Sequence, residues 1–185
     1  MDKRNKWAFL LLPALWVLAL ALAGCGGSEV APPLEGAPTA AAKGGLAFQT
    51  VAQGESLAEN SEAYNLVILD EEAERAQWVA LMNDPAAGQA LTAVDLSTQL
   101  LVGAISSLRP SGGYSITITD MPLTETGVTV RVTMGEPEEG QMTTDMIGQP
   151  YHFVTVLRSE LPAGEGTRWV MQDTDGNALA ETTYP

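Results

Sequence analysis

Only a few side chains in this sequence have the chemistry that catalysis or metal binding requires. The 185-residue chain has a single histidine, His152, and a single cysteine, Cys25. His152 alternates with valines along an apolar run, so we expect a hydrogen-bonded structural residue rather than a general base. Ser106 or Ser115 could complete a Ser-His-Asp set on paper, but neither lies in the strand-turn-helix motif that exposes a catalytic serine. The sequence therefore predicts a protein that is not an enzyme.

Two acidic segments could be taken for metal sites. The segment DTDGN, residues 173–177, resembles the first half of a calcium-binding loop, but it lacks the later ligands and the closing glutamate. Its Asp-Gly pair between two apolar runs is instead typical of a β-hairpin turn. The acids at 71, 72 and 74 begin a predicted helix, where carboxylates commonly face the positive end of the dipole. We therefore predict no metal site and no cofactor.

The segment LRPSGGYSITITD, residues 108–120, raises the question of a ligand-binding loop because Gly112 and Gly113 precede a strand pattern. A phosphate-binding glycine loop needs a helix directly behind it. Here Tyr114 begins a run of alternating polarity, so we expect the glycines to supply positive φ or a bulge in a tight turn between two strands. The Tyr114 ring is expected in the core. A contact with a ligand or partner stays open, because loops on rigid sheets often bind.

The N-terminal residues 1–24 have the pattern of an export signal. Three basic residues precede the apolar run 7–21, which is followed by Leu22-Ala23-Gly24-Cys25. This tetrad resembles the lipobox of bacterial lipoproteins, which implies cleavage before Cys25 and acylation of its sulfur by a fatty acid such as palmitate. The alternative is an uncleaved anchor followed by a free thiol. We expect a protein of the cell envelope, anchored by lipid on the extracytoplasmic side of a membrane at the cell surface.

The charge balance limits the partners. The chain has 9 basic and 23 acidic residues, a net charge of −14. Removing residues 1–24 takes away three basic residues and one acidic residue, which leaves 6 basic and 22 acidic residues and a net charge of −16. Nucleic-acid binding needs clustered lysines and arginines, so this class is excluded. The acidity also disfavours an electrostatic attachment to anionic lipid, which leaves the acyl chains as the membrane contact.

Composition divides the chain into three parts. Residues 25–45 are rich in glycine, alanine and proline and contain no aromatic residue, which is typical of a flexible tether behind the lipidated cysteine. Residues 46–185 are long enough for a single domain with its own core. Because Cys25 is the only cysteine, this domain is predicted to fold without a disulfide.

Hydrophobic periodicity predicts an α+β fold, mainly antiparallel sheet with one or two helices near the N-terminal side of the domain. A helix is expected to begin at Asp70, whose side chain would cap it, and Asp84-Pro85 marks a break or a second start. The continuous apolar run 98–106 is typical of a central strand covered on both faces. Residues 136–148 are expected to form a polar loop. The predicted strands are 46–54, 64–70, 98–106, 114–119, 128–134, 150–158, 167–172 and 178–184.

The order of these segments resembles the PrcB C-terminal domain family. The resemblance runs from about Tyr64 to Arg158 and rests on the segments WVALMN, VDLS, RPSGGYSITI and PYHFVTVLR. Its most specific parts are Gly112-Gly113-Tyr114-Ser115 and Pro150-Tyr151. The family is named for a lipoprotein subunit of a bacterial surface protease complex. The resemblance implies an accessory, non-catalytic role, and it brings no catalytic residue with it.

Two classes of function follow from these observations. The first is a lipid-anchored accessory protein that binds an exported protein, with a secreted protease as the class of partner that the resemblance implies. The second is a ligand-binding or protease-inhibitor-type module. In either case the contacts are expected from the turn at Gly112-Gly113 with Tyr114, from Pro150-Tyr151 or from the loop 136–148. A surface lipoprotein without any partner also remains open.

Overall fold

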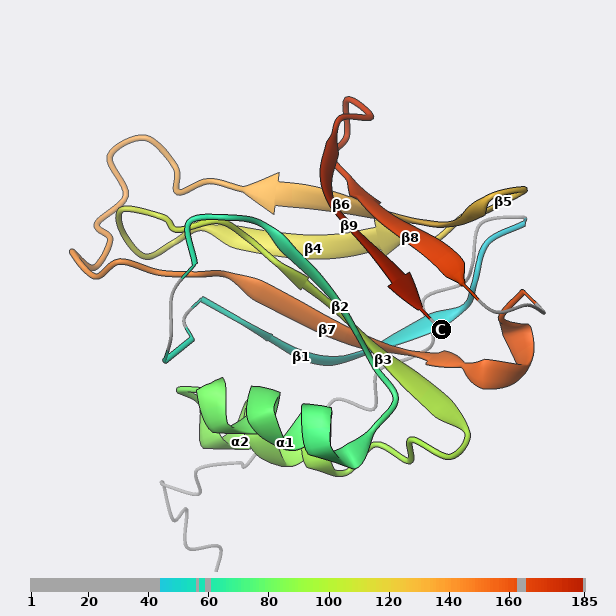
Figure 1. Cartoon of the computed structure of the whole chain (residues 1–185). Coiled ribbons are helices and arrows are strands. Elements are labelled where there is room, and N and C mark those ends of the chain that lie inside the picture. Colours follow the sequence, from blue (N-terminus) through green and yellow to red (C-terminus); the bar gives the residue numbers. More distant parts are fainter. Residues whose placement is uncertain (1–43, 56, 59–60, 163–165, 185) are drawn as a thin grey trace, which may run out of the picture. The chain divides into compact units, whose positions relative to one another are not determined.

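The computed structural model describes residues 44–55, 57–58, 61–162 and 166–184 (Figure 1). Cys25, the expected export signal 1–24 and nearly all of the expected tether 25–45 lie outside the described residues. The described elements are β1 (Phe48–Gly54), β2 (Asn65–Leu69), α1 (Glu72–Leu81), α2 (Pro85–Thr92), β3 (Gln99–Ile105), β4 (Ser115–Asp120), β5 (Leu123–Thr124), β6 (Gly127–Gly135), β7 (Tyr151–Leu157), η1 (Arg158–Glu160), β8 (Thr167–Gln172) and β9 (Ala178–Tyr184). Among the helices described, none has the length and apolar character needed to span a bilayer.

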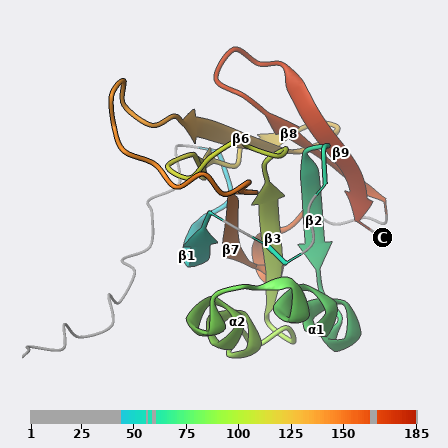
Figure 2. The ribbon, with the colours of Figure 1, turned by 90° about the vertical axis from the view of Figure 1, so that its left-hand side faces the viewer.

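The strands form two sheets that face each other. The first sheet has the order β1-β7-β3-β2 and is antiparallel throughout. The second has the order β4-β6-β8-β9, with β5 paired to β6, and it is antiparallel except where β6 and β8 run parallel. Helices α1 and α2 cover the other face of the first sheet (Figure 2). The expected α+β class with mainly antiparallel sheet is therefore confirmed.

The main core lies between the two sheets. Alternate residues of β4 and β6 point into it, including Ile116, Ile118 and Val130, which are at most 2% exposed. Trp169 of β8 fills the same layer and is fully buried. The outward residues of β4 and β6 are mostly threonines, so the period of two predicted for these strands is confirmed. The strands are therefore rigidly placed by one continuous apolar layer.

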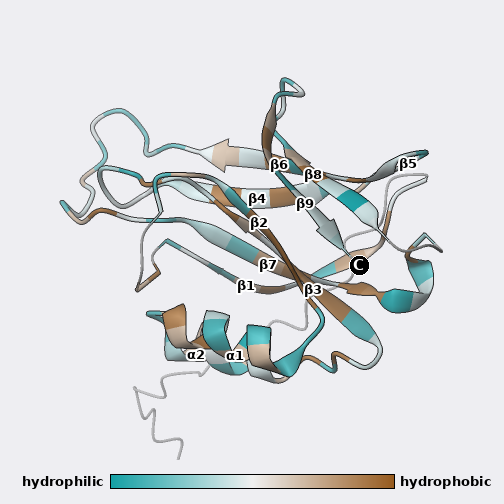
Figure 3. Cartoon of the chain, in the orientation of Figure 1, coloured by the Kyte–Doolittle hydropathy of each residue, from teal (hydrophilic) through white to brown (hydrophobic). Residues whose placement is uncertain are grey.

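A second core lies between the first sheet and the helices. Leu101 and Ile105 of β3 are fully buried and belong to this cluster, whereas Leu100 and Val102 belong to the core between the sheets. Trp78 of α1 packs edge-on against the ring of Phe153 of β7 in this layer. Strand β3 is therefore covered on both faces, as predicted from its unbroken apolar run, and Figure 3 shows the hydrophobic colour along it.

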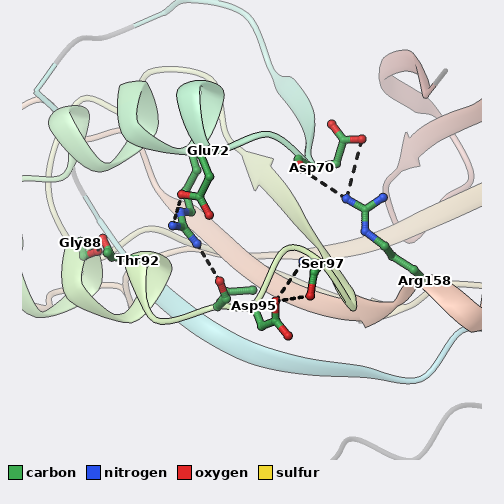
Figure 4. A network of polar contacts seen from close by, with 9 residues as sticks. Asp70, Glu72, Gly88, Thr92, Asp95, Ser97 and Arg158 are labelled. Atoms are coloured by element: carbon green, nitrogen blue, oxygen red, sulfur yellow. Dashed lines mark hydrogen bonds and ion pairs between the residues drawn. The ribbon is translucent and has the colours of Figure 1, made fainter.

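The helix that follows β2 begins differently from the prediction. Its N-cap is Glu71, whose side chain makes no capping hydrogen bond. Asp70 instead accepts a hydrogen bond from the Tyr184 hydroxyl at 2.9 Å and forms an ion pair with Arg158 at 3.8 Å. Figure 4 shows the Arg158 guanidinium next to Asp70, with the contacts between them dashed. The expected cap at Asp70 is therefore wrong, because distant partners compete for this carboxylate.

The second helix begins as predicted. Asp84 is the N-cap of α2, and its carboxylate accepts a hydrogen bond from the Ala86 amide at 2.8 Å. Pro85 occupies the first turn, where its missing N–H has no intrahelical acceptor to lose. Between the helices and β3, Arg75 is buried, donates to the Val94 carbonyl at 2.6 Å and pairs with a glutamate one turn earlier. The helix pair is thus fixed to the chain that enters β3.

Candidate partner-contact surface

The chain between β3 and β4 crosses from one sheet to the other. Strand β3 ends in the first sheet and β4 begins in the second, so residues 106–114 are a crossover connection. The expected tight turn between neighbouring strands is therefore wrong. Gly113 has the expected positive φ, 86°. Gly112 is needed for a different reason, because a Cβ atom there would lie 2.5 Å from Oγ1 of Thr144.

The crossover is joined to the loop between β6 and β7. The amide of Gly112 donates to the carbonyl of Thr144 at 3.0 Å. Arg109 and Gly148 exchange two backbone hydrogen bonds, of 2.8 and 3.0 Å. The Gly113 amide also donates to the Glu55 carboxylate, at 3.3 Å. We call residues 107–114 and 136–148 together the two-loop surface, because each loop is held by the other.

Arg109 joins the two-loop surface to residues outside it. Its guanidinium donates to the Tyr64 hydroxyl at 2.9 Å and to Oγ of Ser106 at 3.1 Å, and it lies 3.1 Å from the sulfur of Met134. The same group lies 5.5 Å from the ring centroid of Tyr114 and 5.9 Å from that of Tyr64, so both rings can interact with the cation. Tyr114 is half-buried against Arg109 and belongs to neither core cluster. The expected core position of its ring is therefore wrong.

The chain that returns to β7 lies beneath the two-loop surface. Gln149 is 1% exposed, and its amide donates to the carbonyls of Ser61 and Ser106 at 3.0 Å each. Pro150 is buried and its carbonyl accepts from the Ser106 amide at 2.8 Å. Tyr151 is 1% exposed, and burial together with the charge of an aspartate raises the pKa of its hydroxyl. The structure therefore places Pro150 and Tyr151 as supports of the loops and not on the accessible surface.

The exposed apolar residues of the described chain are concentrated in this surface. Five large hydrophobic side chains are exposed, and three of them are Met142, Met146 and Ile147, with exposed fractions of 98%, 67% and 58%. Around them, Glu136, Glu138, Glu139 and Asp145 are all exposed, and the loop 136–148 contains no basic residue. The arrangement presents flexible apolar side chains within an acidic border, which suits contact with another molecule.

His152 lies within the core and not on this surface. It is 2% exposed, its Nδ1 accepts from the Ile118 amide at 2.8 Å, and its Nε2 lies 3.0 Å from the hydroxyl of Thr50. Because Nδ1 is an acceptor, the ring proton is on Nε2 and is donated to Thr50. Burial lowers the pKa of His152 to about 4, so the ring is neutral at pH 7. Both ring nitrogens have partners, as expected for a structural histidine.

The other residues considered for chemistry are also accounted for. Ser106 is 1% exposed, and its hydroxyl accepts a hydrogen bond from Arg109, whereas Ser115 is exposed on β4. In the β8–β9 turn, the carboxylate of Asp173 accepts from the backbone amides of Asp175 and Asn177 at 3.0 and 2.8 Å. Hydrogen bonds from Asn177 lower the pKa of Asp173. Within the ranges described, no three His, Cys, Asp or Glu side chains are grouped to hold a metal ion.

The support of the two-loop surface was not anticipated from the sequence. Arg109 and Gln149 act on segments that are distant along the chain, so their sequence context carries no sign of this role. The exposed apolar residues of the loop 136–148 could be detected in the sequence, because Met142, Met146 and Ile147 occur within an otherwise polar segment. Of the predicted site residues, the structure brings Gly112 and Gly113 to this loop and places Tyr114 against Arg109.

A family model matches the part of the chain that contains both loops. The family model described as PrcB C-terminal matches residues 100–156, which extend from β3 through β7 and contain both loops. No curated protein and no solved structure matches the chain. The resemblance predicted from the glycine pair and the Pro-Tyr pair is confirmed over this segment. Over residues 100–156, the chain is similar to the PrcB C-terminal domain family.

Proposed function

We propose that this protein is a lipid-anchored accessory protein of the cell envelope, which acts by binding an exported protein of the secreted-protease class and has no catalytic activity of its own. The observation that carries the proposal is the PrcB C-terminal match over residues 100–156, because the namesake of the family is a subunit of a protease complex. The lipobox-like Leu22-Ala23-Gly24-Cys25 supports the location independently of that match.

The chemistry of the described residues supports a binding role. Nδ1 of His152 would have to give up its hydrogen bond from the Ile118 amide before it could accept a substrate proton. Ser106 is buried and occupied by Arg109. The matched segment instead presents two loops that are braced against each other on a rigid sandwich, which is how binding loops are commonly displayed. A tethered lipid would raise the local concentration of the protein at a membrane-bound partner.

The proposal is tested by capture of the full-length protein from its native envelope. Mild crosslinking and affinity purification should recover one exported protein in constant stoichiometry. Less of this partner should be recovered with the Cys25→Ala variant, while Ser28→Ala, which leaves the lipobox intact, should recover it as wild type does. Recovery of envelope background alone from the native protein would contradict the binding role. Hydrolysis of peptide or ester substrates by the purified protein would contradict the absence of catalysis.

A further inference from the structure

The two-loop surface carries an exposed apolar tip formed by Met142, Met146 and Ile147. Met142, Met146 and Ile147 of the loop 136–148 are 98%, 67% and 58% exposed. Exposed single hydrophobic residues are common on proteins, but three of the five exposed large hydrophobic residues of the described chain lie within residues 142–147. Methionine side chains are flexible and polarizable, so they adapt to apolar partners of different shape.

The charge around this tip indicates what the partner must carry. Glu138, Glu139 and Asp145 are exposed beside the methionines, and the loop 136–148 contains no lysine or arginine to neutralise them. A partner with only apolar side chains would leave these carboxylates unpaired at the border of the contact. A partner with basic residues next to apolar ones would satisfy both parts of the surface.

The same charges argue against two other occupants. A second copy of this chain would bring an identical acidic loop against the first, in a protein whose net charge is −14. An anionic lipid surface would repel the carboxylates, and the loop has no basic residue to offset that repulsion. A basic protein segment is the occupant that these charges favour.

The base of the tip is rigid enough to present it in one place. Gly112 binds the Thr144 carbonyl, and Gly148 pairs with Arg109, so the loop is held at its middle and at its end. A Cβ atom at Gly113 would lie 3.1 Å from Pro137, so the beginning of the loop also packs against the crossover. Fixed loops lose less conformational entropy on binding than free ones.

We infer that residues 138–147 are the docking site for a basic amphipathic segment of the partner protein, with Met142 and Met146 as the apolar anchors and Glu138, Glu139 and Asp145 as the charge partners. The inference rests on the proposed function and specifies where and by what chemistry the partner is held. It requires neither catalysis nor a conformational change of the sheets.

The first test uses a peptide of alternating lysine and leucine as the probe. Full-length protein labelled with 13C in the methionine methyl groups is titrated in mild detergent, and the Met142 and Met146 signals are identified from single leucine substitutions. We expect the peptide to shift these two signals and to leave those of the buried Met121 and Met171 unchanged. Raising the salt concentration should weaken binding. Equal shifts with a glutamate-leucine peptide, or with neutral lipid vesicles, would overturn the inference.

Matched variants separate this site from general attraction to an acidic protein. The double variant Met142→Gln/Met146→Gln should weaken peptide binding about tenfold or more, because truncated interface anchors commonly cost that much. Leu123→Gln changes an exposed apolar residue of β5 that pairs with Val128 at the opposite end of β6, and it should not weaken binding. Likewise Glu138→Gln/Glu139→Gln should weaken binding, whereas Glu125→Gln should not. Equal affinities in the test and control variants would overturn the inference.

A photo-crosslinking residue distinguishes failure of this inference from failure of the proposed function. It is placed at position 142 or at position 123 of the full-length protein in its native envelope. Crosslinks of the partner at 142 and not at 123 support the docking site. Crosslinks at 123 alone would leave the binding function standing and overturn the site. If neither position nor general crosslinking recovers a partner, both the function and the site are wrong.

Discussion

The Nδ1 atom of His152 accepts a hydrogen bond from the backbone amide of Ile118 at 2.8 Å, and this bond joins the two sheets. His152 belongs to β7 in the first sheet, whereas Ile118 belongs to the edge strand β4 of the second. Gln53 of β1 donates to the carbonyl of Ile116 on the same edge, at 2.9 Å. Side chains of one sheet therefore occupy the free edge of the other, which protects that edge from pairing with another chain.

The buried position of His152 predicts that the protein loses stability in mild acid. Burial lowers the folded-state pKa of His152 to about 4, below the ordinary value of 6.5. The neutral ring thus contributes its full stabilisation above pH 6.5, and the contribution is lost as the pH falls toward 4, by about 3 kcal/mol in all. Urea unfolding of wild type and His152→Gln between pH 7.5 and 4 should show a steeper loss in wild type. Parallel curves would show that His152 is not responsible.

The two glycines of the crossover should respond differently to substitution. Gly112→Ala places a methyl group 2.5 Å from Oγ1 of Thr144, so we expect a loss of about 1 kcal/mol that Thr144→Ala restores. Gly113→Ala forces alanine to a φ of 86°, with a loss of about 1 kcal/mol that Thr144→Ala does not restore. Thermal unfolding of Gly112→Ala and Gly113→Ala, each alone and combined with Thr144→Ala, measures these losses of stability. Restoration of both glycine variants, or of neither, would contradict the separate roles.

Arg109 should stabilise the two-loop surface more than its position on a connection suggests. Arg109→Ala removes hydrogen bonds to Tyr64 and Ser106 and the cation between two tyrosine rings, so we expect a loss of about 2 kcal/mol. Hydrogen exchange should quicken at Gly148, whose amide donates to the Arg109 carbonyl. Arg168→Ala, which removes an exposed ion pair, serves as the control and should cost much less. Similar losses in both variants would contradict a special role for Arg109.

Cys25 should decide membrane attachment without deciding stability. We expect Cys25→Ala to appear in the fraction released by a salt wash, because six basic residues in the processed chain provide no strong electrostatic attachment. Its unfolding curve should match that of the wild-type protein, since the core residues from Leu46 onward are unchanged. Retention of the variant on washed membranes would contradict lipid anchoring through this residue.

Periodicity was sufficient where a residue's role depends on its neighbours along the chain. The alternation around Ile116 and Val130 predicted inward and outward faces, and the Asp84-Pro85 pair predicted the start of α2. It failed where the partner is distant. Nothing in the segment around Asp70 indicates that Arg158 and Tyr184 bind its carboxylate, so a local cap was predicted instead. The glycine pair likewise gave no sign that β4 joins a second sheet.

The parallel pairing of β6 with β8 affects the order in which the chain can fold. Gly127 is in register with Arg168, and β7, which belongs to the other sheet, lies between them in sequence. During folding, Val128 and Val130 must wait for the last strands before Trp169 and Met171 cover them. Such distant pairings form late and leave apolar surface open to aggregation in the meantime. Until β8 and β9 are in place, the second sheet is incomplete and its apolar face is open to aggregation.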